Sequence, residues 1–283
     1  MAGSDAEHIF WHYNPSLIAS ITATIVFGIL TILHIFRFIK TRSKICVPFI
    51  FGALNEAIGY AARGIAHNNT DANFPYLVQS IMILIAPIMI AASIYIILGR
   101  VIMMVNAGHH SPIQPKSLGR IFGIGDVITF LMQCTGGVLV ARKVETETGE
   151  QVILGGLGVQ MFLFGFFTVV AVVWHRRVLK SPTPECKPLD GKLWMHMWLL
   201  YLVAACITVR NGCRCVEYAM GPEGYLLRHE WPLYLYDFVL MTITLVICLM
   251  WYEEKFEGQD REGFEGIVEL ESAGERREGR PWV

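Results

Sequence analysis

Seven long runs of apolar residues divide the chain, and short polar connections separate them. Each run has about 20 residues, the length a helix needs to cross roughly 30 Å of hydrocarbon. A segment inside lipid must satisfy its own backbone hydrogen bonds, and the alternation in blocks of about ten residues that a barrel requires is absent. The pattern therefore predicts an all-α polytopic membrane protein, a seven-transmembrane helix bundle. The expected spans are 17–36, 46–66, 76–98, 120–140, 152–174, 193–211 and 233–251.

Local signals support several of these spans. Asn14 and Pro15 form a capping residue followed by a helix-compatible proline at the start of the first span. Trp231 and Trp251 bracket the seventh span, as an aromatic belt at the two membrane interfaces would. Pro87 falls in the middle of the third span, where it frees the carbonyl of Ile83, so we expect a kink there.

The orientation follows from the basic residues in the short connections, because Lys and Arg favour the cytoplasmic side. The odd-numbered connections carry twelve, whereas the N-terminal tail and the even-numbered connections carry five. This predicts an extracytoplasmic N-terminus and a cytoplasmic C-terminus. Asn68-Asn69-Thr70 would then place a glycosylation acceptor, Asn68, outside, although such sequons often arise by chance.

Composition agrees with a membrane protein and divides the chain into three parts. Hydrophobic residues make up 54% of the chain and charged residues only 17%, against about a quarter in soluble domains. We expect an extracytoplasmic tail at 1–16, a membrane domain at 17–251 and a cytoplasmic tail at 252–283. The last segment has ten acids and five bases without a helical apolar stripe, which predicts disorder.

Ionisable residues inside the spans are costly in lipid, so they should face the bundle interior and find partners. The second span carries Glu56, Tyr60 and Arg63 at offsets of four and seven, which places them on one helix face. Glu56 would lie about 15 Å deep, near the midplane. Either a Glu–Arg pair locks helices together here, or Glu56 is a ligand or proton site.

The same spacing recurs in the last two spans. Arg210, Arg214 and Glu217 end the sixth span, and Glu230, Tyr234 and Asp237 open the seventh. Opposite charges at the same level on consecutive helices should pair across the hairpin, as architecture or as part of a site. Asn211 and Gly212 interrupt the arginine segment with helix-weakening residues.

The other spans add further polar groups. Asp126 and Gln133 share a face of the fourth span, and the small pair Gly136-Gly137 permits a close helix approach or a kink. Asp126 belongs to the inner half, where a bond to a neighbouring helix is the simpler interpretation. Most of the polar set maps to the middle or outer half, which predicts a polar pocket open to the outside. The predicted ligand-binding or intramembrane polar network is Glu56, Tyr60, Arg63, Gln79, Asp126, Gln133, Gln160, Arg210, Arg214, Glu217, Glu230 and Asp237.

The segments that match a known family are Glu56 to Arg63, Gln79 to Pro87, Ala91 to Tyr95, Gly99-Arg100, Asp126 to Gly137, Gly156 to Gln160, Arg210 to Glu217, Glu230 and Tyr236-Asp237. With these segments the chain resembles the fungal RTA-like proteins, also called the lipid-translocating exporter family. The resemblance extends from about Tyr13 to Trp251, and its specificity comes from the order of the segments. It implies seven spans with an external N-terminus, and a role in moving sphingoid long-chain bases or other amphiphiles, in resistance to toxicants or, in one branch, in porphyrin uptake.

Three functions are weighed against the sequence. A transporter of amphiphilic lipids could pair a buried acid with an ammonium head, and the absence of a phosphate-binding GxxxxGK[ST] loop makes transport downhill or ion-coupled. A seven-helix lipid receptor is the alternative, although the chain lacks the Asp-Arg-Tyr and Asn-Pro-x-x-Tyr patterns of G-protein-coupled receptors. A zinc hydrolase needs about three clustered His or Asp ligands, and only His34 and His196 lie clearly within spans.

We therefore expect an integral protein of the plasma membrane, with internal membranes as the alternative. Its expected partners are membrane lipids and an amphiphilic small molecule. We expect no catalytic residue, no metal, no other cofactor and no nucleic acid. Cys213 and Cys215 do not form a CxxC motif, and nothing in the sequence sets the oligomeric state.

Overall fold

A computed structural model describes residues 15–67, 73–141, 146–181, 190–221 and 224–252. The glycosylation acceptor predicted at Asn68 lies outside these residues. The same is true of nearly all of the two predicted tails, up to residue 14 and from residue 253.

Seven stretches of the described chain are helical, long and apolar enough to cross a membrane. Each of the first six contains one long helix, and the seventh joins short helical pieces into one span from Trp231 to Trp251. The six are α1 (Leu17–Thr41), α2 (Val47–Ala66), α3 (Asn73–Met104), α4 (Pro115–Ala141), α5 (Thr146–Lys180) and α6 (Asp190–Ala219). The seventh contains α8 (Trp231–Leu233), the π-helical turn η4 (Tyr234–Val239), α9 (Leu240–Cys248) and the 3-10 turn η5 (Leu249–Trp251). Short helices η1 (Lys44–Cys46), η2 (Gly108–His110) and α7 (Tyr225–Arg228) lie in the connections.

The predicted all-α membrane fold and the number of spans are confirmed, but most helices are longer than the apolar runs. Helix α5 continues to Lys180 and α6 to Ala219, because the Arg, Lys and Glu residues that follow the apolar runs are good helix formers. The predicted cap of α1 is wrong: Ser16 is the N-cap, and its Oγ accepts from the amide of Ala19 at 3.4 Å.

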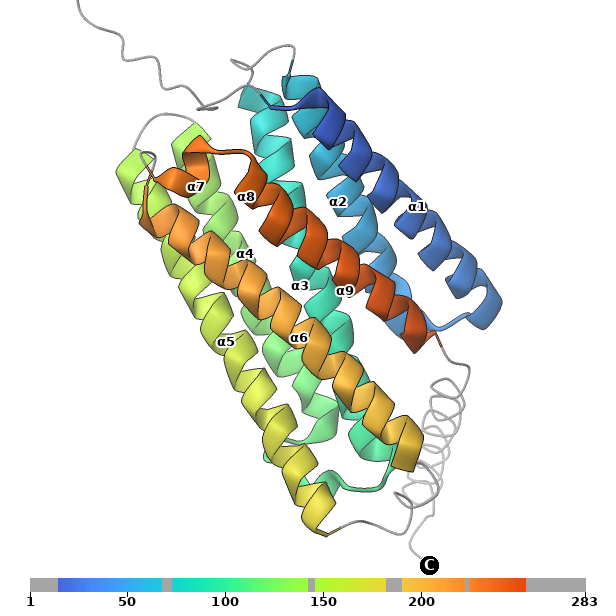
Figure 1. Ribbon diagram of the computed structural model, residues 1–283. Helices are drawn as coiled ribbons and strands as arrows, with labels where there is room; N and C mark the ends of the chain where they lie inside the picture. The colour runs from blue at the N-terminus through green and yellow to red at the C-terminus, as the bar shows by residue number, and fades with distance from the viewer. Residues whose placement is uncertain (1–14, 68–72, 142–145, 182–189, 222–223, 253–283) are drawn as a thin grey trace, which may run out of the picture.

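The helices run up and down in a closed ring (Figure 1). Each span packs on the next in the chain, and α9 returns to contact both α6 and α1. Helix α3 also contacts α6, and it is the most buried of the seven spans. We name the two ends of the bundle by residues that they hold, the Ser16 end and the Trp251 end.

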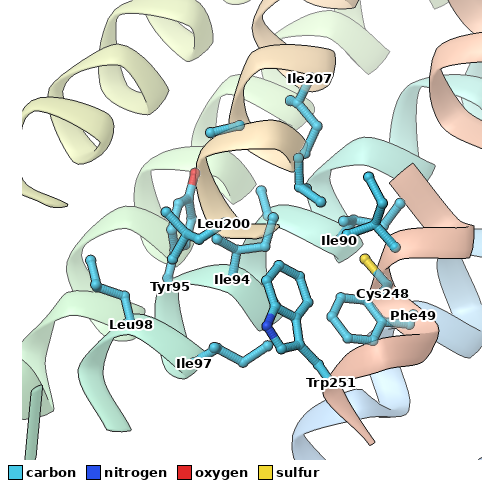
Figure 2. Close-up of a cluster of buried hydrophobic side chains, with 14 of the residues drawn as sticks. Phe49, Ile90, Ile94, Tyr95, Ile97, Leu98, Leu200, Ile207, Cys248 and Trp251 are labelled. Carbon is cyan, nitrogen blue, oxygen red and sulfur yellow. The ribbon is translucent and has the colours of Figure 1, made fainter. Parts of the chain in front are cut away.

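The apolar core runs along α3 and reaches the Trp251 end, where the last span closes the ring (Figure 2). Trp251 is 1% exposed and stacks on Phe49 of α2 with ring centroids 6.2 Å apart, whereas Trp231 is 56% exposed. The predicted aromatic belt is therefore wrong for Trp251, because its ring fills a gap between α2 and the end of the last span. Of the two tryptophans, only Trp231 is exposed, as a residue of an aromatic belt must be.

Glycines set the closest helix contacts. A Cβ on Gly59 would lie 2.7 Å from Cγ1 of Ile83, so α2 approaches α3 closely at this level. A Cβ on Gly136 would lie 2.6 Å from the carbonyl oxygen of Gly149, which confirms the predicted close approach of α4 to its neighbour α5. Gly137 has open space around it and takes no part in this contact.

Candidate functional site

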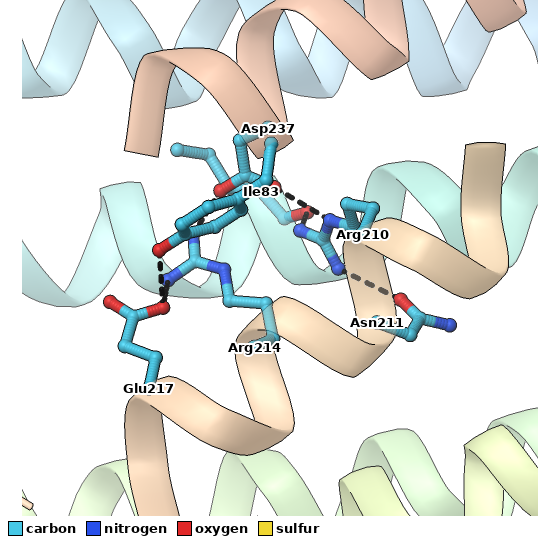
Figure 3. Close-up of polar contacts among 7 residues, drawn as sticks. Ile83, Arg210, Asn211, Arg214, Glu217 and Asp237 are labelled. Carbon is cyan, nitrogen blue, oxygen red and sulfur yellow. Dashed lines mark hydrogen bonds and ion pairs between the residues drawn. The ribbon is translucent and has the colours of Figure 1, made fainter. Parts of the chain in front are cut away.

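A buried ion-paired cluster joins α6 to the π-helical turn of the last span (Figure 3). Nε of Arg210 donates to Oδ1 of Asp237 at 2.6 Å, and Arg214 donates to the other oxygen of the same carboxylate. The expected pairing across the hairpin between the sixth and seventh spans is therefore present. Asp237 is fully buried and Arg210 nearly so, so both charges depend on this geometry for compensation.

Arg210 also bonds to the backbone of α3. Its Nη2 donates to the carbonyl oxygen of Ile83 at 2.9 Å. This is the carbonyl that Pro87, four residues later, leaves without its usual helical donor. Helix α3 runs through Pro87 without a break, and the bend expected at the proline stays a prediction.

The cluster continues toward the Ser16 end through Arg214. Its Nη1 donates to Oε2 of Glu217 at 3.0 Å, and the hydroxyl of Tyr236 donates to the same oxygen at 2.6 Å. The guanidinium carbon of Arg214 also lies 5.6 Å from the centre of the Tyr236 ring. Arg210, Arg214, Glu217 and Asp237 form the ion-paired cluster, which contains two cations and two anions and is neutral as a unit.

Gly212 does not interrupt this arrangement. Helix α6 is continuous across Asn211 and Gly212, and a Cβ at Gly212 would meet nothing within 4 Å. The side chain of Asn211 accepts a bond from Nη1 of Arg210 at 3.3 Å. Asn211 and Gly212, although they weaken helices in general, therefore lie within an intact helix.

Glu56 projects from the middle of α2 toward this cluster. It is fully buried, and it interacts electrostatically with Asp237, Arg210 and Arg214. Among the residues that the structure describes, neither oxygen of its carboxyl group has a hydrogen-bond partner. The close approach of Gly59 to Ile83, one turn further along α2, packs α2 tightly on α3 beside this acid. Glu56 is thus a buried acid next to a neutral cluster, without an ion pair in the described structure.

Tyr60 lies one turn from Glu56 within a group of aromatic rings. It stacks on Phe27 of α1 at 5.6 Å and lies 5.8 Å from Tyr234 and 6.2 Å from Phe238 of the last span. The described residues supply no partner for its buried hydroxyl. These rings connect α1, α2 and the last span between Glu56 and the Ser16 end.

A second ion pair, between Arg63 and Glu230, joins helices at the Ser16 end. Nη2 of Arg63 donates to Oε1 of Glu230 at 2.9 Å, and both carboxylate oxygens of Glu230 accept from the amide of Ser16. The guanidinium of Arg63 lies over the ring of Tyr234, with its carbon 5.6 Å from the centroid. Three helices, α1, α2 and α8, therefore meet at one carboxylate.

Glu230 and Asp237 do not share a face, although their offset of seven predicted that they would. Glu230 bonds to α1 and α2, whereas Asp237 bonds to α6. The reason is the π-helical turn η4 between them, because a π turn holds more residues than the 3.6 of an α turn. The same-face rule for seven residues fails across such a turn.

The remaining predicted site residues do not belong to the ion-paired cluster. The hydroxyl of Tyr95 on α3 donates to Oδ2 of Asp126 at 2.9 Å, which is the expected bond to a neighbouring helix. Nε2 of Gln133 donates to Oε1 of Gln160 at 2.7 Å and joins α4 to α5. Gln79 is buried on α3, and its Oε1 has no partner among the described residues.

Sequence reasoning missed the hydroxyl donors of this arrangement. Tyr95 and Tyr236 enter the sequence analysis only through the family resemblance, yet each donates to a buried acid. The signal that could have found them is a tyrosine within a span, because a buried tyrosine hydroxyl usually finds a hydrogen-bond partner, and a buried carboxylate on a neighbouring span can accept from it. Cys213 and Cys215 are free thiols, and the described residues contain no group of three His, Cys, Asp or Glu placed to hold a metal ion.

Comparison with known proteins places the chain in a family. A family profile described as "RTA1 like protein" matches residues 49–259, from within the first turn of α2 to beyond the end of the last span. The chain belongs to the RTA1-like family. No solved structure matches the chain.

Several yeast members of the family are similar along most of the chain. Protoporphyrin uptake protein 1 of Saccharomyces cerevisiae is 27% identical over 87% of this chain and 92% of that protein. Protein RTM1 of the same species is 30% identical over 75% of this chain and 68% of its own length. Sphingoid long-chain base transporter RSB1 is 25% identical over 89% of this chain and 75% of that protein.

Proposed function

We propose that this RTA1-like protein translocates amphiphilic lipids, such as sphingoid long-chain bases, or related toxic amphiphiles across the membrane. Its similarity to a protein named as a sphingoid long-chain base transporter supports this class of substrate. Its similarity to a protein named for protoporphyrin uptake supports movement of amphiphiles more generally. In this proposal the protein resides in the plasma membrane, and the Ser16 end is extracytoplasmic.

The observation that carries the proposal is the gathering of charge inside the bundle. Glu56, Arg210, Arg214 and Asp237 come from α2, α6 and the last span, and all four are buried. By helical rise Glu56 lies about 15 Å and Arg210 about 14 Å from the helix ends nearest Ser16. Charges at such depth are expensive in a membrane, and they commonly mark the path of a substrate or an ion.

In this proposal the polar head group of the lipid lies in this region, and its hydrocarbon chain lies along the apolar surfaces between the helices. In the proposed site, Glu56, Tyr60 and the ion-paired cluster contact the head group. Arg63 and Glu230 close the Ser16 end, and Gln79 adds an amide oxygen that has no partner in the described structure. Asp126 and the Gln133–Gln160 pair serve to join helices, because each has its partner on the neighbouring span.

A flux assay tests the proposal. Purified protein in liposomes is expected to speed the transbilayer movement of a fluorescent single-chain amine lipid above the rate in empty liposomes. The Asp237→Asn variant, which weakens the ion-paired cluster, should lose most of that rate, and Glu147→Gln, a change at an exposed acid of α5, should keep it. Saturable binding of the lipid without any flux would instead indicate a lipid receptor.

A further inference from the structure

Charge balance around Glu56 identifies what this acid must bind. The ion-paired cluster is neutral by itself, with Arg210 and Arg214 against Glu217 and Asp237. An ionised Glu56 would therefore add one uncompensated negative charge at a fully buried position. A lone buried carboxylate costs too much free energy to persist, so the site needs either a proton or another cation on Glu56.

The neighbouring arginines do not meet this need by direct contact. Arg210 directs its nitrogens at Asp237, Ile83 and Asn211, and Arg214 directs its Nη groups at Glu217 and Asp237. Neither oxygen of Glu56 receives a hydrogen bond from any described residue.

The other elements packed around Glu56 add no further compensating charge. On α3, residues 83–90 lie opposite this face of α2 and include no titratable side chain. The buried face of α1 carries a single titratable residue, His34, which bonds to Tyr252 at the Trp251 end. The remaining groups that interact with Glu56 are Tyr60 on its own helix and Asp237 on the last span.

We propose that Glu56 is an exchange site that holds either one proton or the cationic head of one amphiphile, and so couples export of the amphiphile to entry of a proton. This inference rests on the proposed function and names its substrate class, single-chain cations, and its energy source. Tyr60, one turn from the acid on α2, packs among the rings of Phe27, Tyr234 and Phe238, and such aromatic faces also attract an ammonium group.

The exchange balances in protons and charge. As the ammonium head arrives, the carboxylic acid of Glu56 releases its proton to water on that side, and the carboxylate becomes the counter-ion of the head. On the opposite side a proton from water returns to the carboxylate, and the amphiphile leaves. Each cycle moves one cation one way and one proton the other, so no net charge crosses the membrane.

The test follows both ions in proteoliposomes of the full chain. The probe is a fluorescent single-chain quaternary ammonium amphiphile, because a permanent cation cannot cross as a neutral amine. With a pH difference of one unit, one-for-one exchange should concentrate the probe about tenfold on the acidic side. A pH dye inside the vesicles should report one proton leaving for each probe molecule that enters, and clamping the membrane potential should change neither result.

Variants assign the exchange to the carboxyl group. Glu56→Gln should reduce proton-linked probe movement at least tenfold, whereas Glu56→Asp should keep the one-for-one ratio. Glu147→Gln is the matched control, since it makes the same chemical change at an exposed acid that is not part of the cluster. The wild-type protein alone tests whether probe and protons exchange one for one, so this part of the test does not depend on the folding of a variant.

The outcomes separate this inference from the proposed function. Probe flux in wild type without proton movement, or proton-linked flux that survives in Glu56→Gln, would overturn the exchange site and leave lipid translocation standing. Absence of flux for every amphiphile tested with wild type would remove both.

Discussion

The guanidinium of Arg210 bonds to the backbone carbonyl of Ile83, the carbonyl that Pro87 deprives of a donor. One side chain thereby satisfies a defect in α3 and, at the same time, the buried carboxylate of Asp237. An unpaired backbone carbonyl and a buried carboxylate are each costly in lipid, and one guanidinium group between them supplies hydrogen bonds to both. The cluster is therefore expected to fix the position of α3 relative to α6 and the last span.

Loss of Arg210 should strongly destabilise the protein. Arg210→Leu leaves Asp237 with one cation and Ile83 without a donor, and breaking a buried pair from one side costs about 3–5 kcal/mol. Thermal unfolding in detergent measures the loss, with Arg120→Leu at an exposed position of α4 as the control. Equal stability of the two variants would show that the cluster does not hold the helices.

Removal of the Glu230 carboxylate should loosen the start of α1. This carboxylate accepts from the amide of Ser16 and pairs with Arg63, and a hydrogen bond to a charged group contributes about 1.5–3 kcal/mol. Glu230→Ala should then speed hydrogen exchange at the first turn of α1 by about tenfold or more. Mass spectrometry of peptides from this turn provides the measurement, with Glu147→Ala as the reference. Unchanged exchange would mean that α1 is held by its apolar contacts alone.

Adjacent glycines on α4 should respond in opposite ways to the same substitution. A methyl group at Gly136 would meet the backbone of Gly149, so Gly136→Ala should cost about 1–3 kcal/mol. Gly137 faces open space, and Gly137→Ala should be neutral or should stabilise the helix by up to about 1 kcal/mol. The unfolding temperatures of the two variants give a direct comparison. If Gly136→Ala proved as stable as Gly137→Ala, the close approach of α4 and α5 would be refuted.

The two tryptophans of the last span should also differ. Trp251 is buried against Phe49, and truncation of a buried aromatic side chain to Ala costs about 3–5 kcal/mol. Trp231 is mostly exposed, so Trp231→Ala should change the unfolding temperature in detergent much less. Similar losses in both variants would contradict the burial of Trp251 at the closing seam of the ring.

The number and type of spans could be predicted because lipid imposes one solution on a long apolar run. Helix ends could not, since residues such as Lys180 and Glu217 continue a helix after the apolar run has stopped. The pairing of Arg210 with Asp237 could also be predicted, because both lie at a similar depth on consecutive spans. The polar side chains nevertheless form several separate contacts, since Gln133 and Asp126 find partners on their nearest helices.

The partner of Glu230 illustrates what a sequence pattern lacks. An offset of seven places two residues on one face only while the helix keeps α geometry, and no residue type in the segment from Tyr234 to Val239 signals a π turn. The depth of Glu56 can be predicted from helical rise. Its isolation from any ion pair depends on where Arg63 and both arginines of α6 direct their nitrogens, which requires coordinates.

The π-helical turn also affects which deletions the last span can tolerate. Because the turn accommodates one extra residue, a deletion of one residue between Tyr234 and Val239, other than Tyr236 or Asp237, would return the segment to α geometry and leave the two halves of the span in nearly the same relative orientation. Glu230 would stay beside Arg63, and Asp237 would stay beside Arg210. A deletion within α9 would instead rotate the rest of the span by about 100°, so single-codon losses should be more damaging there than inside these six residues.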